Sequence, residues 1–352
     1  MQLEVKRDDL RVTRVVDDRV GEPSDGEAVL RVEQFAVTAN NVTYAVFGDA
    51  MRYWAFFPAS EAGWGRVPVW GHSVVASSRA PGLAEGTKVY GYLPMGSSLV
   101  VRPERVTATG FVDASPHRAA LPSVYNQYQL VQAHDRERET AILRPLFLTG
   151  FLIDDWLADE GLGGADTVLL ASASSKTALA TAFLLSQRED IEVVGVTSPA
   201  NVAFVEKVGY YDRAVAYDDI QSLPVVPTAF VDMAGGGVTL AAVHNHLRDA
   251  LTSSCLVGAT HWEESAPAAE LPGPAPSFFF APDRIQKRVA EWGGDAYNER
   301  VEAAWGAFLT SVDGWLDIAE RFGADELVDT WLEVVDGRTP PDVAYVVTPA
   351  SR

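Results

Sequence analysis

The sequence predicts an α/β protein in which a β-rich first part precedes a doubly wound parallel sheet. Within Asp166–Tyr217, a strand, a tight turn, a helix and a second strand follow one another, which is a βαβ unit. Residues 1 to about 135 instead show short β-type runs separated by turn residues. With 352 residues the chain is long for one hydrophobic core, so we expect two domains.

The β-rich part is expected to contain several short strands. The runs Glu27–Phe35, Val67–Val75 and Thr87–Tyr92 alternate with turns rich in Gly, Pro and Asp. Asn40–Tyr44 begins a loop or short helix, which leads into an aromatic tract, Tyr53–Phe57.

The parallel sheet is predicted from apolar runs of strand length. Thr167–Leu170 is typical of a strand buried on both faces, and Ile191–Val196 is a second such run. The small-residue turn Ala171–Ser175 and a helix rich in Ala and Leu connect them. Further parallel strands are expected at Arg213–Tyr217, Ala229–Met233 and Ser254–Gly258.

Boundaries follow from charge and turn composition. The charged run His134–Glu139 indicates an exposed linker or helix start, and Leu271–Pro276 is rich in Pro and Gly. We expect domains at residues 1–138 and 139–275, and a return of residues 276–352 to the first domain. Within that return, Asn298–Phe322 has helical apolar spacing and Val343–Val347 resembles a strand.

Composition and charge limit the partners. The chain is 47% hydrophobic and 22% charged, which is typical of a globular protein. Its formal charge of −20 is spread along the chain and would repel nucleic acid and anionic lipid. We therefore expect a small-molecule substrate, with neither nucleic acid nor a membrane as partner.

The cysteine count and the absence of long apolar runs predict a cytoplasmic protein. Cys255 is the one cysteine, which excludes disulfides within the chain and cysteine-based zinc sites. No signal peptide and no apolar run of about 18 residues is seen.

The turn after the first parallel strand is the expected cofactor site. Backbone N–H groups at a helix N-terminus and the positive end of the helix dipole bind phosphate readily. The turn has no glycine, although dinucleotide turns usually read G-x-G-x-x-G. An ordinary turn without ligand is the alternative. A nucleoside-triphosphate loop is rejected, because Ser175 and Leu170 occupy the places of its glycines.

The order of several motifs resembles one family over about residues 10–290. It is similar to the zinc-free medium-chain dehydrogenase/reductase superfamily, in its quinone-oxidoreductase and enoyl-reductase branch. The matching segments are Asn41–Tyr44 with Gly48, Pro68–His72, Gly86–Gly91, Leu148–Phe151 as a helix start, Ala173–Ala178, Val193–Ser198, Val231–Gly236 and Leu256–Ala259.

This resemblance implies a GroES-like β-rich catalytic domain and a Rossmann-type doubly wound domain. It also implies hydride transfer from nicotinamide to an activated C=C or C=O, in an enone, quinone or enoyl thioester, without zinc. A homodimer formed through the last sheet strand, Ser254–Ala259, is implied as well. His72 stands without a nearby cysteine, so no metal ligand is expected.

The choice of cofactor is predicted from charge. NAD-specific folds place an acidic residue after the second strand, whereas Thr197–Asn201 contains none. Lys176 adds a cation that could reach a phosphate, so NADP(H) is favoured. Helix capping is the alternative role of Ser198 and Asn201. The predicted cofactor-binding residues are Asn41, Thr149, Ser174, Ser175, Lys176, Thr177, Ser198, Asn201, Tyr217 and Gly258.

The predicted catalytic residues are two tyrosines. A neutral tyrosine hydroxyl suits a developing oxyanion or enolate as hydrogen-bond donor. Tyr53 lies at about the place where enoyl-reductase relatives have an acid tyrosine, and Tyr44 replaces the family's aspartate. Tyr125 and Tyr128 are outside candidates. For each tyrosine, packing with a satisfied hydroxyl is the alternative role.

Two other functions fit the same fold. The chain could be a non-catalytic NADP(H)-binding or structural member, or a pathway-specific carbonyl reductase. Fold does not determine substrate, so the sequence leaves these readings open.

Overall fold

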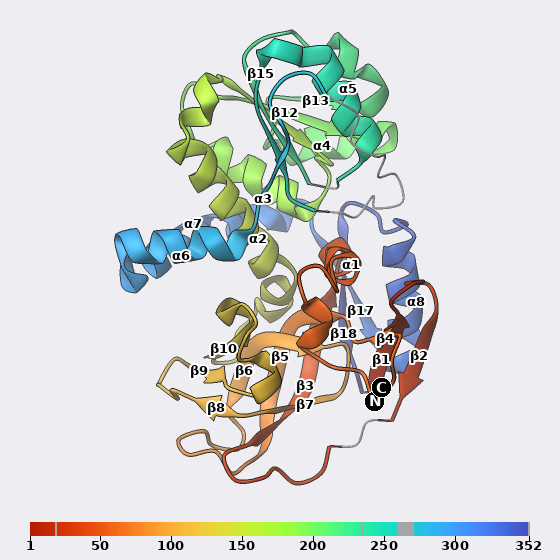
Figure 1. Cartoon of the computed structure of the whole chain (residues 1–352), viewed down its shortest axis with the longest axis vertical. Helices are drawn as coiled ribbons and strands as arrows, with labels where there is room; N and C mark the ends of the chain where they lie inside the picture. Colours follow the sequence, from red (N-terminus) through yellow and green to blue (C-terminus); the bar gives the residue numbers. More distant parts are fainter. Residues whose placement is uncertain (18–19, 234, 259–270, 351–352) are drawn as a thin grey trace. The chain divides into compact units, whose positions relative to one another are not determined.

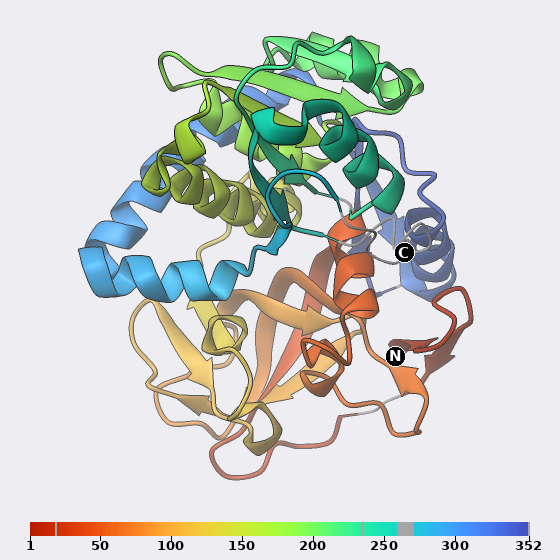
Figure 2. The same ribbon diagram turned by 45° about the horizontal axis from the view of Figure 1, so that its top comes forward.

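The computed structural model describes residues 1–17, 20–233, 235–258 and 271–350. The chain divides into two compact units (Figures 1 and 2). The first unit comprises Met1–Leu143 and Asp317–Arg352, and the second comprises Arg144–Leu316. Residues 276–316, which the sequence assigned to the C-terminal return, thus pack within the second unit.

The first unit is built on a large sheet and a small one, which confirms the predicted β-rich part. Among the described residues the large sheet has nine strands in the order β17-β18-β3-β5-β6-β10-β9-β8, and β7 pairs with β3. The small sheet has the order β2-β1-β4. The strands are β1 Gln2–Lys6, β2 Thr13–Val16, β3 Ala28–Val37, β4 Trp64–Gly65, β5 Pro68–Ser78, β6 Lys88–Pro94, β7 Ser98–Val101, β8 Pro103–Glu104, β9 Gly110–Asp113, β10 Gln127–Leu130, β17 Asp317–Phe322 and β18 Val343–Thr348.

The two ends of the chain meet in this unit. Strand β18 pairs with β3, with Tyr345 opposite Val37. Helix α8 (Gly323–Val335) buries Trp331 completely, and the indole Nε1 of this residue donates a hydrogen bond to the Leu10 carbonyl at 2.8 Å. The other helical segments of the unit are α1 Ala39–Val46, η1 Tyr53–Ala55, η2 Pro116–Arg118 and η3 Ser123–Asn126.

The second unit contains the predicted parallel sheet. Its strands lie in the order β13-β12-β11-β14-β15-β16, and each neighbouring pair is parallel. Counted from β11, this is the order 3-2-1-4-5-6 of dinucleotide-binding sheets, whose ligands bind at the carboxyl edge. The strands are β11 Thr167–Ala171, β12 Glu192–Thr197, β13 Arg213–Ala216, β14 Thr228–Asp232, β15 Leu251–Leu256 and β16 Ser277–Phe278.

Helices lie on both faces of this sheet (Figure 1). On one face, Val243 and Leu247 of α5 pack with sheet residues such as Leu169 and Phe230. On the other, Phe183 of α3 meets Phe308 of α7 at 5.4 Å between ring centroids. The helical segments are α2 Glu137–Asp159 (which contains the unit boundary), η4 Gly161–Gly164, α3 Lys176–Leu185, η5 Pro199–Asn201, α4 Val202–Val208, η6 Tyr217–Ser222, α5 Gly237–Leu247, η7 Arg248–Ala250, α6 Ala281–Trp292, α7 Gly294–Ser311 and η9 Val312–Gly314.

Two predicted helix limits are wrong. The helix expected over Asn298–Phe322 ends at Ser311, and Asp317–Phe322 instead forms β17 because it pairs in parallel with β18. Leu148–Phe151 is not a helix start, since it lies in the interior of α2. Ala234 and Ala259, which belong to two of the quoted motifs, lie outside the described residues.

The edge of the parallel sheet differs from the expected dimer strand. Beyond β15 lies β16, which pairs with it at Cys255 and Leu256. Phe278 of β16 is 43% exposed. Dimer formation stays a prediction, and the strand that a second copy would meet at this edge is β16.

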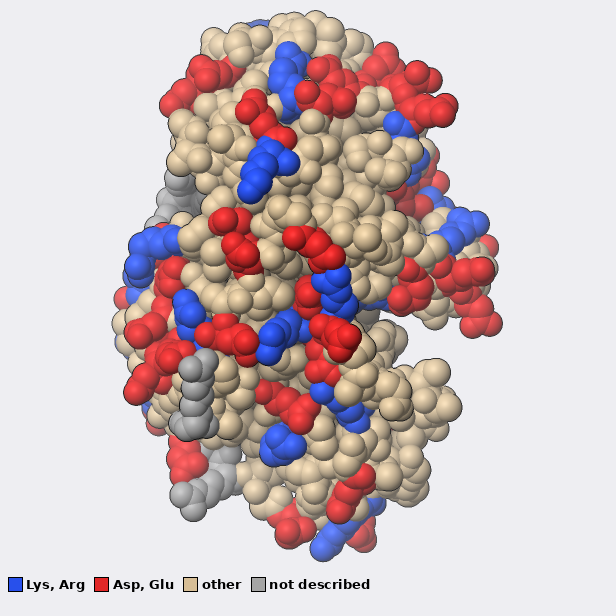
Figure 3. Space-filling view, turned by 180° about the vertical axis from the view of Figure 1, so that it is seen from behind, with Lys and Arg blue, Asp and Glu red and all other residues tan. Residues whose placement is uncertain are grey.

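The charged side chains are interspersed over the surface. Figure 3 shows acidic and basic side chains mixed across one face, in keeping with the predicted spread of the −20 charge. Among the helices of the described residues, none is both long and apolar enough to cross a membrane.

Candidate functional site

The predicted cofactor turn lies at the carboxyl end of β11 and is closed by hydrogen bonds. Ser172 has a φ of 54°, in the left-handed region that glycine normally occupies. The Ser175 N–H donates to the Ser172 carbonyl at 2.8 Å, and the Ala173 N–H donates to the Val196 carbonyl at 3.0 Å. The sequence therefore makes a tight turn here without the usual glycines.

A glycine in the neighbouring strand supports the turn. A Cβ at Gly195 of β12 would lie 2.8 Å from the Ala173 Cβ and 3.0 Å from a ring carbon of Tyr211. The Tyr211 hydroxyl donates to the Ala173 carbonyl at 2.9 Å, and the Ser172 and Tyr217 hydroxyls are 3.1 Å apart. Gly195 thus allows β12 to lie close to the turn, and the hydroxyls of Tyr211 and Tyr217 form hydrogen bonds with it.

Ser174 is the most clearly oriented hydroxyl of the turn. Its Oγ accepts a hydrogen bond from Thr197 Oγ1 at 3.1 Å and another from Asn201 Nδ2 at 3.0 Å. A hydroxyl has one proton and two lone pairs, so both acceptor positions are used and the proton remains to be donated. Among the described residues no acceptor takes that proton. The arrangement suits a ligand with acceptor oxygens.

The start of α3 adds further donors. Ser175 is the N-cap, and its side chain accepts from the Ala178 N–H at 3.2 Å. The N–H groups of a helix's first turn have no acceptor within the helix. Lys176 and Thr177 are the first two helical residues, and both are half-buried.

Other predicted residues lie at the same carboxyl edge. Ser198 is the N-cap of η5, directly after β12, and Gly258 follows β15 two residues after its end. Both are half-buried. Between Thr197 and Asn201 no carboxylate follows β12, as the sequence predicted for NADP(H).

The side chains of Asn41 and Thr149 are engaged in local hydrogen bonds. Asn41 Oδ1 accepts from the Thr38 N–H at 2.7 Å, and its Nδ2 donates to the Pro68 carbonyl at 2.8 Å. Thr149 Oγ1 donates to the Pro145 carbonyl at 3.0 Å within α2. These hydrogen bonds give both side chains a role within the fold. Their roles in binding a cofactor stay predictions.

The predicted catalytic tyrosines lie in an aromatic cluster of the first unit, which we call the tyrosine cluster. Tyr44 and Tyr53 are each 6% exposed, and their ring centroids are 4.7 Å apart. Trp70 Nε1 donates to the Tyr44 hydroxyl at 3.2 Å. The cluster consists of Tyr44, Tyr53, Phe56, Phe57, Trp70, Tyr92, Leu121 and Tyr125.

Tyr53 is paired with a second tyrosine. Its hydroxyl lies 3.2 Å from that of Tyr125 on η3. Burial raises the pKa of Tyr53, and the hydrogen bond with Tyr125 opposes that rise. Burial also raises the pKa of Tyr44 and of Tyr125, so all three are neutral donors at pH 7.

Sequence reasoning missed two members of this region. Tyr92 is fully buried at the centre of the cluster, and none of the described residues is a hydrogen-bond partner of its hydroxyl. Arg118, 1% exposed, pairs with Asp113 at 3.0 Å and lies over the Phe57 ring at 4.7 Å. Lys88, Tyr90 and Tyr92 are alternate residues of β6, and this spacing predicts that they lie on one face of the sheet. Nothing in the sequence indicates that Arg118 is buried.

His72, for which the sequence predicts no metal, lies inside the first unit. It is fully buried on β5, and neither ring nitrogen has a hydrogen-bond partner among the described residues. Burial lowers its pKa to about 4. Among the described residues, no group of three or more His, Cys, Asp and Glu is placed to hold a metal ion. Freedom from zinc stays a prediction.

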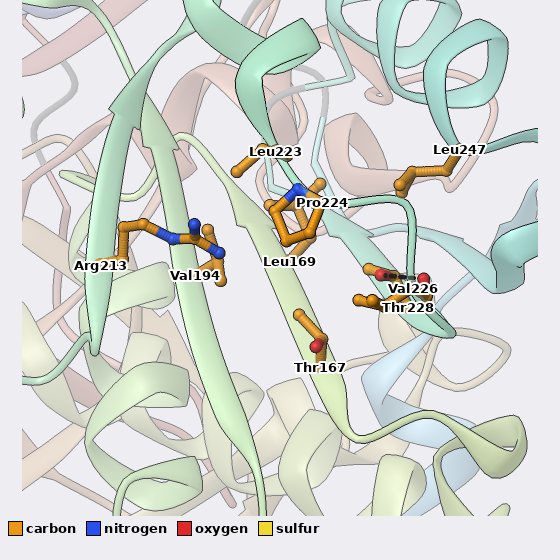
Figure 4. A pocket seen from close by; sticks show the side chains of 9 residues that line it. All are labelled: Thr167, Leu169, Val194, Arg213, Leu223, Pro224, Val226, Thr228 and Leu247. Atoms are coloured by element: carbon orange, nitrogen blue, oxygen red, sulfur yellow. Dashed lines mark hydrogen bonds between the residues drawn. The ribbon is translucent and has the colours of Figure 1, made fainter.

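Two hollows of the second unit lie at the amino edge of the sheet. The smaller, about 10 Å³, is bordered by the first residues of three strands, Thr167, Arg213 and Thr228, and has room for about one water (Figure 4). The larger, about 390 Å³, lies beside Trp156, Gly163 and Thr252. Neither is near the turn after β11, so neither belongs to the candidate cofactor site.

The whole fold is shared with several solved structures that contain NADPH or NADP. CurA from Vibrio vulnificus in complex with NADPH has a TM-score of 0.60 at 13% identity, over 97% of this chain and 95% of that one. YhdH of E. coli K-12 with bound NADPH gives 0.59 at 13%, over 99% of both chains. The YhdH oxidoreductase from Salmonella enterica with NADP gives 0.56 at 14%, over 96% and 95%.

The protein therefore has the fold of these NADPH- or NADP-containing proteins, which confirms the predicted fold class. The chain belongs to the family described as "Protein of unknown function (DUF2855)", which matches residues 35–340. A comparison with curated proteins gives no match.

Proposed function

We propose that this protein is an NADPH-dependent oxidoreductase that reduces an activated C=C or C=O without zinc. One observation carries the proposal: the Ser174 hydroxyl, oriented by Thr197 and Asn201, keeps its proton for an acceptor at the carboxyl edge of the sheet. The NADPH or NADP in the solved structures of the same fold supports this reading.

The residues at the turn fit a dinucleotide phosphate. Ser174 and the first turn of α3 would donate hydrogen bonds to phosphate oxygens, and Lys176 would supply a positive charge. The absence of a carboxylate between Thr197 and Asn201 leaves room for the extra phosphate of NADPH. When bound, the cofactor supplies the hydride.

The tyrosine cluster would bind the substrate oxygen. Tyr53 is our candidate for the acid, since a neutral phenol can donate a proton to an oxygen that becomes negative during reduction. Tyr44 is the second candidate donor. Aromatic side chains dominate the tyrosine cluster, so we propose an apolar, conjugated substrate such as an enone or quinone.

The test is a titration followed by a turnover assay. We expect NADPH to bind at micromolar concentration and NADH more weakly, measured by the change in NADPH fluorescence. Oxidation of NADPH is then followed at 340 nm with a panel of enones, quinones, enoyl thioesters and simple ketones. Reduction of a ketone alone would identify a carbonyl reductase.

Two results would contradict the proposal. Binding of NADPH without turnover of any substrate in the panel would indicate the non-catalytic NADP(H)-binding alternative. Absence of binding would indicate a structural member of the fold. A Tyr53→Phe variant that binds NADPH normally but turns over at the wild-type rate would remove Tyr53 as the acid.

A further inference from the structure

We propose that Tyr125 is a positioning residue for Tyr53, holding its oxygen and donating a hydrogen bond to it when Tyr53 gives up its proton. This inference rests on the proposed function, because it concerns the acid of that reaction. It adds a second tyrosine, from a segment far along the chain, to the proton-donating machinery.

The geometry of the pair carries the proposal. The two hydroxyl oxygens are 3.2 Å apart, and the ring centroids are 5.8 Å apart with the planes at 76°. Tyr53 is 6% exposed and Tyr125 is 8% exposed, so water competes little for this hydrogen bond. In such a pair either hydroxyl can donate. Once the Tyr53 proton leaves, Tyr125 is the remaining donor.

The segment that carries Tyr125 is held in place by buried polar contacts. Arg118 and Asp113, each 1% exposed, form an ion pair at 3.0 Å. Asn126 Nδ2, next to Tyr125, donates to the Arg118 carbonyl at 3.2 Å. The guanidinium also donates to the Tyr128 hydroxyl at 3.0 Å. Because Asn126 ties the end of η3 to this buried group, the Tyr125 hydroxyl has little freedom to leave its partner.

The pKa shifts of the two tyrosines agree with this geometry. Burial is the main cause that raises the pKa of Tyr53, and the hydrogen bond with Tyr125 lowers it. Burial is likewise the main cause for Tyr125, but there the same hydrogen bond raises the pKa further. Tyr125 is therefore the later of the two to lose its proton, and it is the available donor to the Tyr53 oxygen once Tyr53 is deprotonated.

The proton and electron balance of the step is simple. The acceptor carbon of the substrate gains a C–H bond from the hydride, the C=C or C=O is reduced, and NADPH is oxidised to NADP⁺. The Tyr53 O–H bond breaks as an O–H bond forms at the substrate oxygen. The resulting Tyr53 phenolate accepts the Tyr125 hydrogen bond until a proton from water restores it.

The test compares Tyr125→Phe with Tyr297→Phe, both in the full-length chain, with NADPH and a substrate that the wild type reduces. Tyr297 of α7 is a matched control, since it is buried, lies outside the tyrosine cluster, and its hydroxyl has no partner among the described residues. A hydrogen bond to a charged group contributes about 1.5–3 kcal/mol, so kcat of Tyr125→Phe should fall roughly 10- to 150-fold. Substrate KM and NADPH affinity should stay unchanged.

Two further readouts separate positioning from packing. The solvent deuterium isotope effect on kcat should rise in Tyr125→Phe, because proton donation by Tyr53 becomes slower, and should stay at the wild-type value in Tyr297→Phe. In protein labelled with ¹³C at tyrosine Cζ, the Tyr53 resonance should move in Tyr125→Phe and stay in place in Tyr297→Phe. This second readout needs no turnover.

The outcomes are distinct. Wild-type kcat and isotope effect in Tyr125→Phe, with an active wild type, would overturn this inference and leave the proposed function standing. Equal losses in the two variants would also overturn it, since packing alone would then explain both. If the wild type oxidises NADPH with none of the substrates in the panel, the proposed function is overturned, and this inference with it.

Discussion

Asn201 Nδ2 donates a hydrogen bond to Ser174 Oγ at 3.0 Å, joining the segment after β12 to the turn after β11. Together with the bond from Thr197 Oγ1 at 3.1 Å, it leaves the Ser174 proton as the group to be donated. The two places where a dinucleotide fold contacts its cofactor are therefore linked by one serine hydroxyl.

Ser174→Ala should weaken NADPH binding about 10- to 150-fold, the equivalent of a hydrogen bond to a charged phosphate at about 1.5–3 kcal/mol. Fluorescence titration measures the change. Ser186→Ala, at the other end of α3, is the matched control, and its affinity should remain that of the wild type. Equal affinities of both variants would show that Ser174 does not contact the cofactor.

Lys176→Ala should also weaken NADPH binding by about 1.5–3 kcal/mol, because its cation lies at the first residue of α3, where an anion is favoured. Equal losses for NADPH and NADH would assign Lys176 to the pyrophosphate, and a loss for NADPH alone to the extra phosphate. Lys207→Ala, an exposed lysine in the last turn of α4, serves as control. Unchanged binding of both cofactors would make Lys176 an ordinary helix-start residue.

Arg118→Met should lower the free energy of unfolding by about 3–5 kcal/mol, because it leaves the buried carboxylate of Asp113 without its cation. Urea unfolding followed by tryptophan fluorescence gives the value. The control is Arg338→Ala, whose ion pair with Asp336 is exposed and should contribute less than about 1 kcal/mol. A loss as small as that of the control would mean that the Arg118 pair does not stabilise the unit.

The stability of the first unit should fall on acidification because of His72. Burial lowers its pKa to about 4, with Glu137 opposing this shift and Lys88 and His134 adding to it, whereas the unfolded value is about 6.5. Between these values the unfolded chain binds a proton at His72 that the folded chain does not bind. The resulting loss of unfolding free energy is absent above pH 6.5 and reaches about 3 kcal/mol near pH 4.

His72→Phe should abolish that part of the acid loss. Unfolding free energies of the two proteins between pH 4 and pH 7 provide the comparison. Since neither ring nitrogen has a partner among the described residues, the phenyl ring breaks no hydrogen bond there. An equally steep loss in both proteins would show that other groups cause the acid sensitivity.

The parallel sheet could be predicted because its strands are continuous apolar runs. Thr167–Leu170 and Ile191–Val196 correspond closely to β11 and β12. Predicted strand Ser254–Gly258 instead begins at Leu251, since Thr252 and Ser253 are polar and give no apolar signal. Helical spacing also continued past Ser311, and pairing with β18, a long-range contact, makes β17 a strand.

The candidate site was predictable in its residue types and less so in its contacts. Ser174 and Asn201 were singled out separately, but the hydrogen bond between them depends on how β11 and β12 align. Tyr53 was predicted from a family resemblance, whereas its partner Tyr125 comes from a segment 72 residues away. Contacts between distant segments leave no periodic pattern in a sequence, so only the structure brings these residues together.

The position of β18 between β17 and β3 has a consequence for synthesis of the protein. During translation Val37 leaves the ribosome long before Tyr345, its neighbour in the sheet. The second unit, Arg144–Leu316, is continuous in sequence and can fold while the chain is still growing. Until β18 is made, the part of β3 that it pairs with, Phe35 to Val37, has an unpaired edge. That strand edge is the point at which a nascent chain would need a chaperone.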